Sequence, residues 1–278
     1  MHALYTLRFA LMGLLGLLGL LALLAGCAPM LMVPPAHVSQ GESPRALRAG
    51  QVAAGGSYVG TGVFHGLFES GLTAKMFSGE TTVGLGNNLD VRLLASYASL
   101  KSEGEEPGLF GRRRKHVDYY GATGFDRNVF ATTLRLKWNP RRNPGWAMTL
   151  GGGVGDGLGQ NFWSVEHAQI FGAENRFLTP YLNVKGAISS PFKARRVTWD
   201  STRYWSAYSK TPRTTLGLEA LVGVRIPLAD LRTASDRRRA NHPFLRGEIG
   251  VLSLQDGDSP GAIMGATASV ALVFPLRR

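Results

Sequence analysis

The feature that most constrains this chain is a strict alternation of apolar with polar or small residues over long stretches. From Leu216 to Ile226 every second residue is leucine, alanine, valine or isoleucine, and the residues between them include Gly217, Glu219 and Arg225. Successive side chains of a β-strand point to opposite faces of a sheet, so a period of two predicts a strand with one apolar and one polar face.

The same alternation continues along most of the chain after residue 50 and predicts an all-β protein. Ten strands are expected, near residues 51–62, 71–86, 88–100, 128–138, 145–157, 175–188, 192–207, 213–227, 243–254 and 261–275. Strands in soluble sheets usually have about five or six residues, whereas about nine to eleven residues cross a bilayer at a tilt. We therefore predict an antiparallel up-and-down β-barrel of about ten strands, embedded in the outer membrane.

The predicted connections are unequal in length. An even number of strands places both ends of a barrel segment on one side, and short connections at 87–88, 139–144 and 189–191 would lie on that side. Longer connections at 101–127 and 158–174 would lie on the other side. The connection at 229–242 is too long for this rule. The arrangement resembles that of small outer-membrane β-barrel proteins, which have short periplasmic turns and longer external loops.

Charged residues of both signs lie near the centres of the predicted polar faces. They are Asp90, Arg92, Arg135, Lys137, Lys185, Glu219, Arg225, Arg246 and Glu248. Glycines such as Gly151 and Gly153 share these faces, where they would leave room for long side chains in a narrow lumen. Because a buried charge is tolerated only when it is paired, we predict a charge network in the lumen. The alternative is that these residues form the solvent face of a soluble β domain.

The N-terminal residues predict export. Arg8 is followed by an uncharged stretch from Phe9 to Leu24, in which only glycine interrupts the apolar residues. This stretch is shorter than the roughly 20 apolar residues that span a bilayer as a helix, and small residues follow it. Residues 1–26 are therefore interpreted as a signal peptide.

The segment Leu24-Ala25-Gly26-Cys27 resembles the lipobox of bacterial lipoproteins. The resemblance implies that the chain is cut before Cys27 and that Cys27 is acylated, so that membrane lipid anchors the mature protein. Alanine rather than aspartate at position 28 implies export to the outer membrane. Cys27 is the only cysteine of the chain, so no disulfide can form within one molecule.

The mature chain would consist of a lipidated tether, residues 27–50, and a β-barrel domain, residues 51–278. Its formal charge is the +12 of the whole chain less the single charge of Arg8, which is +11. Nucleic acid, the usual partner of basic chains, is not expected for an exported protein. The expected partners are lipopolysaccharide phosphates and other envelope proteins. The candidate anion-binding residues, in the predicted 101–127 loop, are Arg112, Arg113, Arg114 and Lys115.

Two groups of residues have the types needed for acyl transfer, in which a histidine takes the proton of a hydroxyl and an acid orients the ring. One group is Ser164, Glu166 and His167, in the predicted 158–174 loop. The other is His65, Glu69 and Ser70. Neither matches a family motif, and no pair of histidine or cysteine residues has metal-ligand spacing. We therefore predict no enzymatic activity, no cofactor and no metal.

The sequence predicts a non-enzymatic outer-membrane lipoprotein that acts as an envelope scaffold or docking component. A barrel of about eight strands is already filled by its own side chains, so free diffusion through about ten strands is not expected. The parts free to bind would be the loops, the tether and an aromatic region formed by Phe192, Trp199, Tyr204, Trp205 and Tyr208. The alternatives are a lipid-anchored soluble periplasmic β domain, a narrow pore, and a lipid-modifying hydrolase or acyltransferase.

Overall fold

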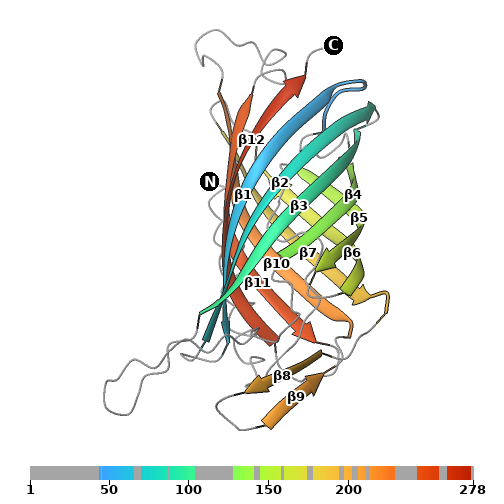
Figure 1. Ribbon diagram of the computed structural model, residues 1–278. Helices are drawn as coiled ribbons and strands as arrows, with labels where there is room; N and C mark the ends of the chain where they lie inside the picture. The colour runs from blue at the N-terminus through green and yellow to red at the C-terminus, as the bar shows by residue number, and fades with distance from the viewer. Residues whose placement is uncertain are drawn as a thin grey trace, which may run out of the picture.

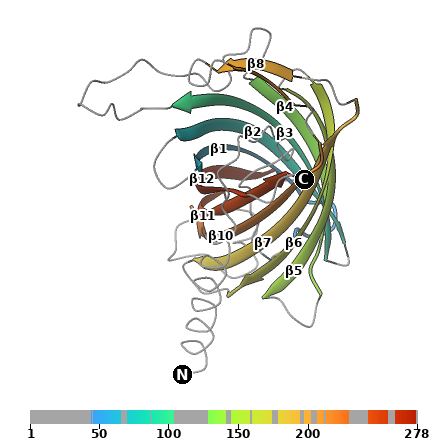
Figure 2. The same cartoon turned by 90° about the horizontal axis from the view of Figure 1, so that it is seen from below.

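A computed structural model shows that the chain forms a closed barrel of ten antiparallel strands with an additional two-stranded sheet (Figures 1 and 2). The structure describes residues 44, 46–65, 70–86, 88–103, 128–140, 145–157, 160–173, 178–193, 197–201, 206–210, 213–228, 243–256 and 262–276. The barrel strands are β1 (Val52–His65), β2 (Ser70–Gly86), β3 (Leu89–Glu103), β4 (Asn128–Trp138), β5 (Trp146–Gly157), β6 (Gln160–Gly172), β7 (Thr179–Pro191), β10 (Thr215–Pro227), β11 (Phe244–Asp256) and β12 (Ala262–Leu276). The separate sheet pairs β8 (Val197–Ser201) with β9 (Ser206–Lys210).

The barrel has the predicted up-and-down topology. Each barrel strand pairs with the barrel strands that precede and follow it in the chain, with β7 paired directly to β10. β1 and β12 close the ring in a continuous register from Val52↔Leu276 to Phe64↔Met264. The predicted fold class and the count of ten barrel strands are therefore confirmed.

One barrel strand was not predicted, and one predicted strand is not part of the barrel, so the total of ten is unchanged. β6 lies within the predicted 158–174 loop, and only residues 158–159 separate it from β5. The predicted strand at 192–207 is not in the barrel, since β8 and β9 form their own sheet there. β6 escaped prediction because its alternation is not clean: Phe162 and Ile170 face the lumen, while His167 faces outward.

The barrel has two unlike ends, which are visible at the top and bottom of Figure 1. At one end, called the terminal mouth below, β1 begins and β12 ends, and residues 87–88, 139–145, 173–178 and 228–243 connect strands. At the other, the loop end, the connections are 66–69, 104–127, 158–159, 192–214 with the β8–β9 sheet, and 257–261. The predicted connection at 189–191 was assigned to the wrong side, because Pro191 ends β7 at the loop end.

The barrel is apolar outside and polar inside. Phe77, Phe130 and Ile249 on the exterior are each more than half exposed, whereas charged residues such as Asp90 and Glu219 are buried in the lumen. A soluble barrel has the opposite arrangement, since water would surround the exterior. The barrel strands have 11 to 17 residues, enough to cross a bilayer at a tilt. The structure is therefore that of a membrane-embedded barrel. Among the described residues, no helix is long and apolar enough to cross a membrane.

Candidate functional site: the lumen and the terminal mouth

The alternation of strand faces brings the charges of β3 and β4 together inside the lumen. Asp90 and Arg92 are two residues apart on β3 and therefore share a face, and in the β3–β4 register they stand opposite Lys137 and Arg135. All four side chains are buried. Lys137 Nζ lies 3.0 Å from Asp90 Oδ2, an ion pair in which both partners are shielded from solvent.

Glu80 of β2 is the centre of a larger buried cluster. Its carboxylate binds the guanidinium of Arg92, and Arg246 Nη2 on β11 lies 3.2 Å from the same oxygen. Arg246 Nε is also 3.5 Å from Glu248 Oε1. Glu80 is 7 % exposed. Sequence reasoning did not select Glu80, although its even-numbered position places it on the face of Met76 and Gly84, both of which point inward.

Glu248 extends this cluster across β7 and β12. It accepts a hydrogen bond of 2.5 Å from the Tyr181 hydroxyl and one of 2.6 Å from Ser269 Oγ. The Tyr181 ring occupies the space over Gly223 of β10, where an added Cβ would overlap the ring. This glycine therefore leaves room for a lumen side chain, the role that was expected of polar-face glycines.

Two further ion pairs fill other parts of the lumen. Arg135 Nε lies 2.7 Å from Glu166 Oε1 of β6, and Lys185 Nζ of β7 lies 2.5 Å from Glu219 Oε2 of β10. These four residues are 5 % exposed or less. A Cβ added at Gly151 would lie 2.9 Å from Glu166 Oε1, so glycine again makes room for a charged side chain.

Arg225 is the predicted lumen residue whose environment differs from the rest. It is only half-buried, and its guanidinium carbon lies 3.9 Å from the centre of the Phe244 ring. Glu219, on the same strand, pairs with Lys185 instead. The structure thus brings predicted lumen charges of both signs into contact inside the barrel.

Ser164, Glu166 and His167, one of the two candidate groups for acyl transfer, do not share a face. Ser164 and Glu166 lie on β6 and point into the lumen, whereas His167 points outward and lies 2.8 Å from Gln169 Nε2. A histidine on the opposite face of a strand cannot take the proton of the Ser164 hydroxyl. In the other group Glu69 lies outside the described residues, as do the side-chain surroundings of His65 and Ser70.

Several predicted residues lie outside the part of the chain that the structure describes. They are Cys27, Arg112, Arg113, Arg114, Lys115, Tyr204 and Trp205. In the β8–β9 sheet, Trp199 and Tyr208 stand opposite each other in register, and Phe192, just after β7, is 59 % exposed. Within the described ranges, no group of three or more histidine, cysteine, aspartate or glutamate residues could hold a metal ion.

The end of the predicted tether lies in the terminal mouth. The backbone N–H of Leu47 donates a hydrogen bond of 2.9 Å to Asp90 Oδ1, and the N–H of Gly50 donates one of 2.8 Å to the Gly84 carbonyl. Leu47 lines a cavity of about 50 Å³ in the lumen, together with residues that include Glu80, Arg92 and Lys137. No sequence signal indicated these contacts, because residues 44–50 show no alternation.

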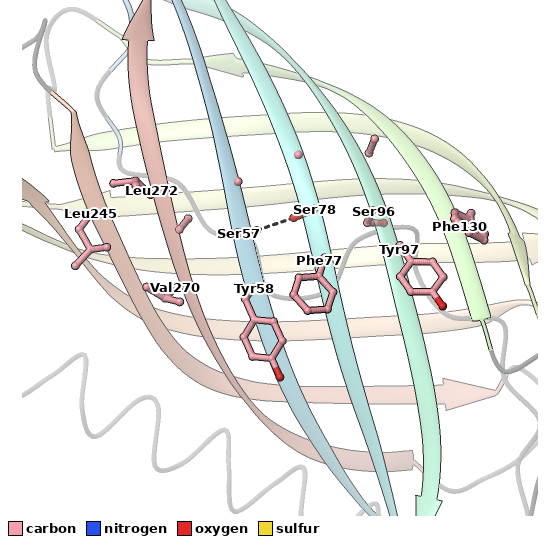
Figure 3. Close-up of a pocket in the computed structure, with 14 residues that line it drawn as sticks. Ser57, Tyr58, Phe77, Ser78, Ser96, Tyr97, Phe130, Leu245, Val270 and Leu272 are labelled. Atoms are coloured by element: carbon pink, nitrogen blue, oxygen red, sulfur yellow. Dashed lines mark hydrogen bonds between the residues drawn. The ribbon is translucent and has the colours of Figure 1, made fainter.

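The exterior carries a shallow apolar groove of about 680 Å³ over β1, β2, β3 and β12 (Figure 3). Its floor includes Gly56, Gly79 and Ala95, which are neighbours in register. Its walls hold two ring pairs, Tyr58 with Phe77 at 5.0 Å and Tyr97 with Phe130 at 4.8 Å between centroids, and the aliphatic residues Leu245, Val270 and Leu272. The groove opens toward the surface that faces membrane lipid.

No family model matches this chain, and no curated protein matches it. Among solved structures it is similar to neisserial surface protein A, with 12% identity, 80% of this chain and 96% of that chain covered, and a TM-score of 0.34. It is also similar to an outer-membrane channel from Pseudomonas putida, with 10% identity, 86% of this chain and 100% of that chain covered, and a TM-score of 0.41. A third similar structure is the β domain of the Bordetella autotransporter BrkA, with 8% identity, 82% of this chain and 100% of that chain covered, and a TM-score of 0.47. At these identities and TM-scores the likeness carries no inference about activity. The membrane location follows from the chain's own apolar exterior.

Proposed function

We propose that this chain is a non-enzymatic lipoprotein of the bacterial outer membrane, whose closed barrel serves as an envelope scaffold or docking component. The apolar exterior and polar lumen support the embedded barrel, since charges would otherwise face water. The lipobox-like segment ending at Cys27 supports the lipid anchor. With both ends of the barrel on one side, an anchor in the inner leaflet would place the terminal mouth in the periplasm.

The buried ion pairs that join non-adjacent strands inside the lumen are the observation that carries this proposal. Glu80, Arg246 and Glu248 join β2 to β11, while Arg135 with Glu166 joins β4 to β6 across β5. A solute would have to separate such pairs to pass, and removing one partner of a buried pair costs about 3–5 kcal/mol. The same contacts that would block a pore therefore stabilise the barrel wall, which favours a scaffold over a channel.

The docking part of the proposal rests on the loop end. The 104–127 connection carries Arg112 to Lys115, and guanidinium groups match the geometry of phosphate oxygens in two hydrogen bonds at once. Lipopolysaccharide phosphates would lie at this level of the membrane if the terminal mouth faces the periplasm. Acidic surfaces of other envelope proteins are the second class of partner with this charge.

The absence of enzymatic activity is likewise part of the proposal. Its support is that the group with the best residue types, Ser164, Glu166 and His167, is divided between the two faces of β6. A lipid-modifying activity would need another histidine or base near Ser164. Glu166, on the same face of β6 as Ser164, is paired with Arg135.

The central test is conductance of the purified full chain in planar bilayers, with a general porin as the positive control. We expect no stable channels at moderate voltage, and reproducible large conductance would overturn the scaffold. The anchor is tested separately by labelling cells with a palmitate analogue. Incorporation into the parent but not into Cys27→Ala supports acylation, while equal labelling rejects it.

The loop end is tested with vesicles that contain lipopolysaccharide and with matched vesicles of phospholipid alone. A variant with Arg112, Arg113, Arg114 and Lys115 all replaced by glutamine keeps the loop length and removes its positive charge. The parent protein should bind the lipopolysaccharide vesicles more tightly than the variant does. Equal binding would show that the cationic run is ordinary solvated loop.

A further inference from the structure

We propose that residues 44 and 46–50, called the strap below, form a built closure of the terminal mouth rather than a loose end of the tether. This inference goes beyond the scaffold function and does not depend on acylation of Cys27. It rests on where the strap crosses the mouth, on the barrel residues shaped to receive it, and on the cavity that Leu47 lines.

The strap crosses from one wall of the barrel to the other. Pro44 is buried against Gly172 at the end of β6, and Arg48 lies against Gly84 near the end of β2. Between β2 and β6, the ring contains β3, β4 and β5 on one side and β1, β12, β11, β10 and β7 on the other. The two contact points are therefore on nearly opposite walls, and the strap spans the opening.

The contact between the strap and β2 requires a glycine at position 84. A Cβ added at Gly84 would overlap the Arg48 carbonyl and lie 2.9 Å from Leu47 Cβ, so any side chain there would occupy the strap's position. Without a side chain, Gly84 can bond to the end of the strap and to the residue that follows it. The Gly50 N–H of the strap donates to the Gly84 carbonyl at 2.8 Å, and the Gly84 N–H donates to the carbonyl of Gln51, the residue after the strap, at 2.9 Å.

On β3, the carboxylate of Asp90 binds both the strap and a residue of the barrel wall. Asp90 Oδ1 accepts the Leu47 N–H, while Asp90 Oδ2 faces Lys137 Nζ. Asp90 is only 1 % exposed, so this backbone contact lies inside the mouth rather than on its rim. On the β6 side, a Cβ at Gly172 would lie 2.9 Å from two ring carbons of Pro44.

Leu47 of the strap lines a charged cavity at the terminal mouth. The charged residues that line this cavity of about 50 Å³ are Glu80, Arg92, Lys137, Arg225 and Arg246. The cavity is large enough for a few water molecules at most. The strap precedes β1 and contacts the barrel through the Leu47–Asp90 and Gly50–Gly84 hydrogen bonds, so it can leave the mouth while the barrel strands stay paired.

Hydrogen exchange of the full chain in detergent micelles tests the strap directly. We expect the amides of Leu47 and Gly50 to exchange at least about tenfold more slowly in the parent than in Gly84→Leu, whose side chain displaces the strap. The matched control is Gly79→Leu on the same strand, where an added Cβ meets nothing within 4 Å. It should exchange like the parent.

A second variant protects the test against a folding defect in Gly84→Leu. Leu47→Pro removes the N–H that Asp90 accepts and changes no barrel residue, so it should raise exchange at Gly50 while heat-modifiable migration stays unchanged. The proposal is wrong if the parent's Leu47 and Gly50 amides exchange as fast as those of a free peptide. It is also wrong if neither variant changes them. The conductance test is independent of hydrogen exchange, so rejection of the strap proposal would not reject the proposed scaffold function.

Discussion

Glycine residues have different structural roles on the two faces of this barrel. In the lumen, a side chain at Gly223 would overlap Tyr181, and one at Gly151 would press on Glu166. On the exterior, added Cβ atoms at Gly60, Gly79 and Gly247 would meet nothing within 4 Å. These two lumen glycines therefore make room for Tyr181 and Glu166, whereas a side chain at the three exterior glycines would lie in open space.

The charges follow the same division and suggest where the barrel is most sensitive. Every ion pair that involves Glu80, Glu166, Glu219 or Glu248 is buried in the lumen. The exterior holds apolar side chains whose exchange for others of the same kind alters little. Substitutions inside should thus cost stability through unpaired charge and overlap, and substitutions outside should cost little.

The largest effect should come from Glu80→Leu. It leaves Arg92 and Arg246 buried without their shared carboxylate, and breaking a buried pair costs about 3–5 kcal/mol. The matched control is Arg225→Leu, because Arg225 is half-buried and its stacking on Phe244 contributes about 1 kcal/mol or less. The measurement is the heat-modification midpoint of each variant on denaturing gels. Equal shifts for both variants would mean that the lumen is hydrated enough to screen these charges.

The contrast between Glu80 and Arg225 also shows what sequence can reveal. The even or odd position of a residue along a strand assigns it to one of the two faces, and Arg92 and Glu219 are buried in the structure. Parity does not say which residues of other strands stand opposite, because that depends on register. Glu219 therefore pairs with Lys185 across β7 and β10 rather than with Arg225 on its own strand.

Where the alternation is mixed, even the strand could not be predicted. β6 carries Phe162 in the lumen and His167 outside, so neither of its faces is uniformly apolar. The Ser164, Glu166 and His167 group looked like a loop cluster for the same reason. In β4, by contrast, Leu134 and Leu136 alternate with Arg135 and Lys137, and the predicted bounds 128–138 agree with the structure. The contacts of residues 44–50 had no sequence signal, because they depend on chain crossing and not on periodicity.

A smaller effect is expected for Gly223→Val in the lumen. The valine side chain would overlap the Tyr181 ring and push its hydroxyl away from Glu248, and overpacking of this kind costs about 1–3 kcal/mol. The double variant Gly223→Val with Tyr181→Ala removes the overlap and isolates its cost. If the single variant matches the parent in its heat-modification midpoint, the Tyr181 ring can move aside, and the lumen is less tightly packed than the contacts indicate.

The smallest effect should be that of Gly79→Leu on the exterior. The new side chain enters the floor of the apolar groove between Gly56 and Ala95, where it faces hydrocarbon and meets no backbone. Leucine also restricts the unfolded chain more than glycine does, so the midpoint should stay level or rise by up to about 1 kcal/mol in equivalent stability. The Gly79→Leu variant also distinguishes a groove that contacts only lipid from one that a protein partner occupies. In a groove that contacts lipid, the added leucine changes only the number of acyl contacts. In a contact between proteins, it removes the close approach that small residues allow. We expect the purified variant to keep the parent's size in micelles and its heat-modification midpoint. Loss of an assembly present in the parent would instead show that the exterior glycines serve a contact between proteins.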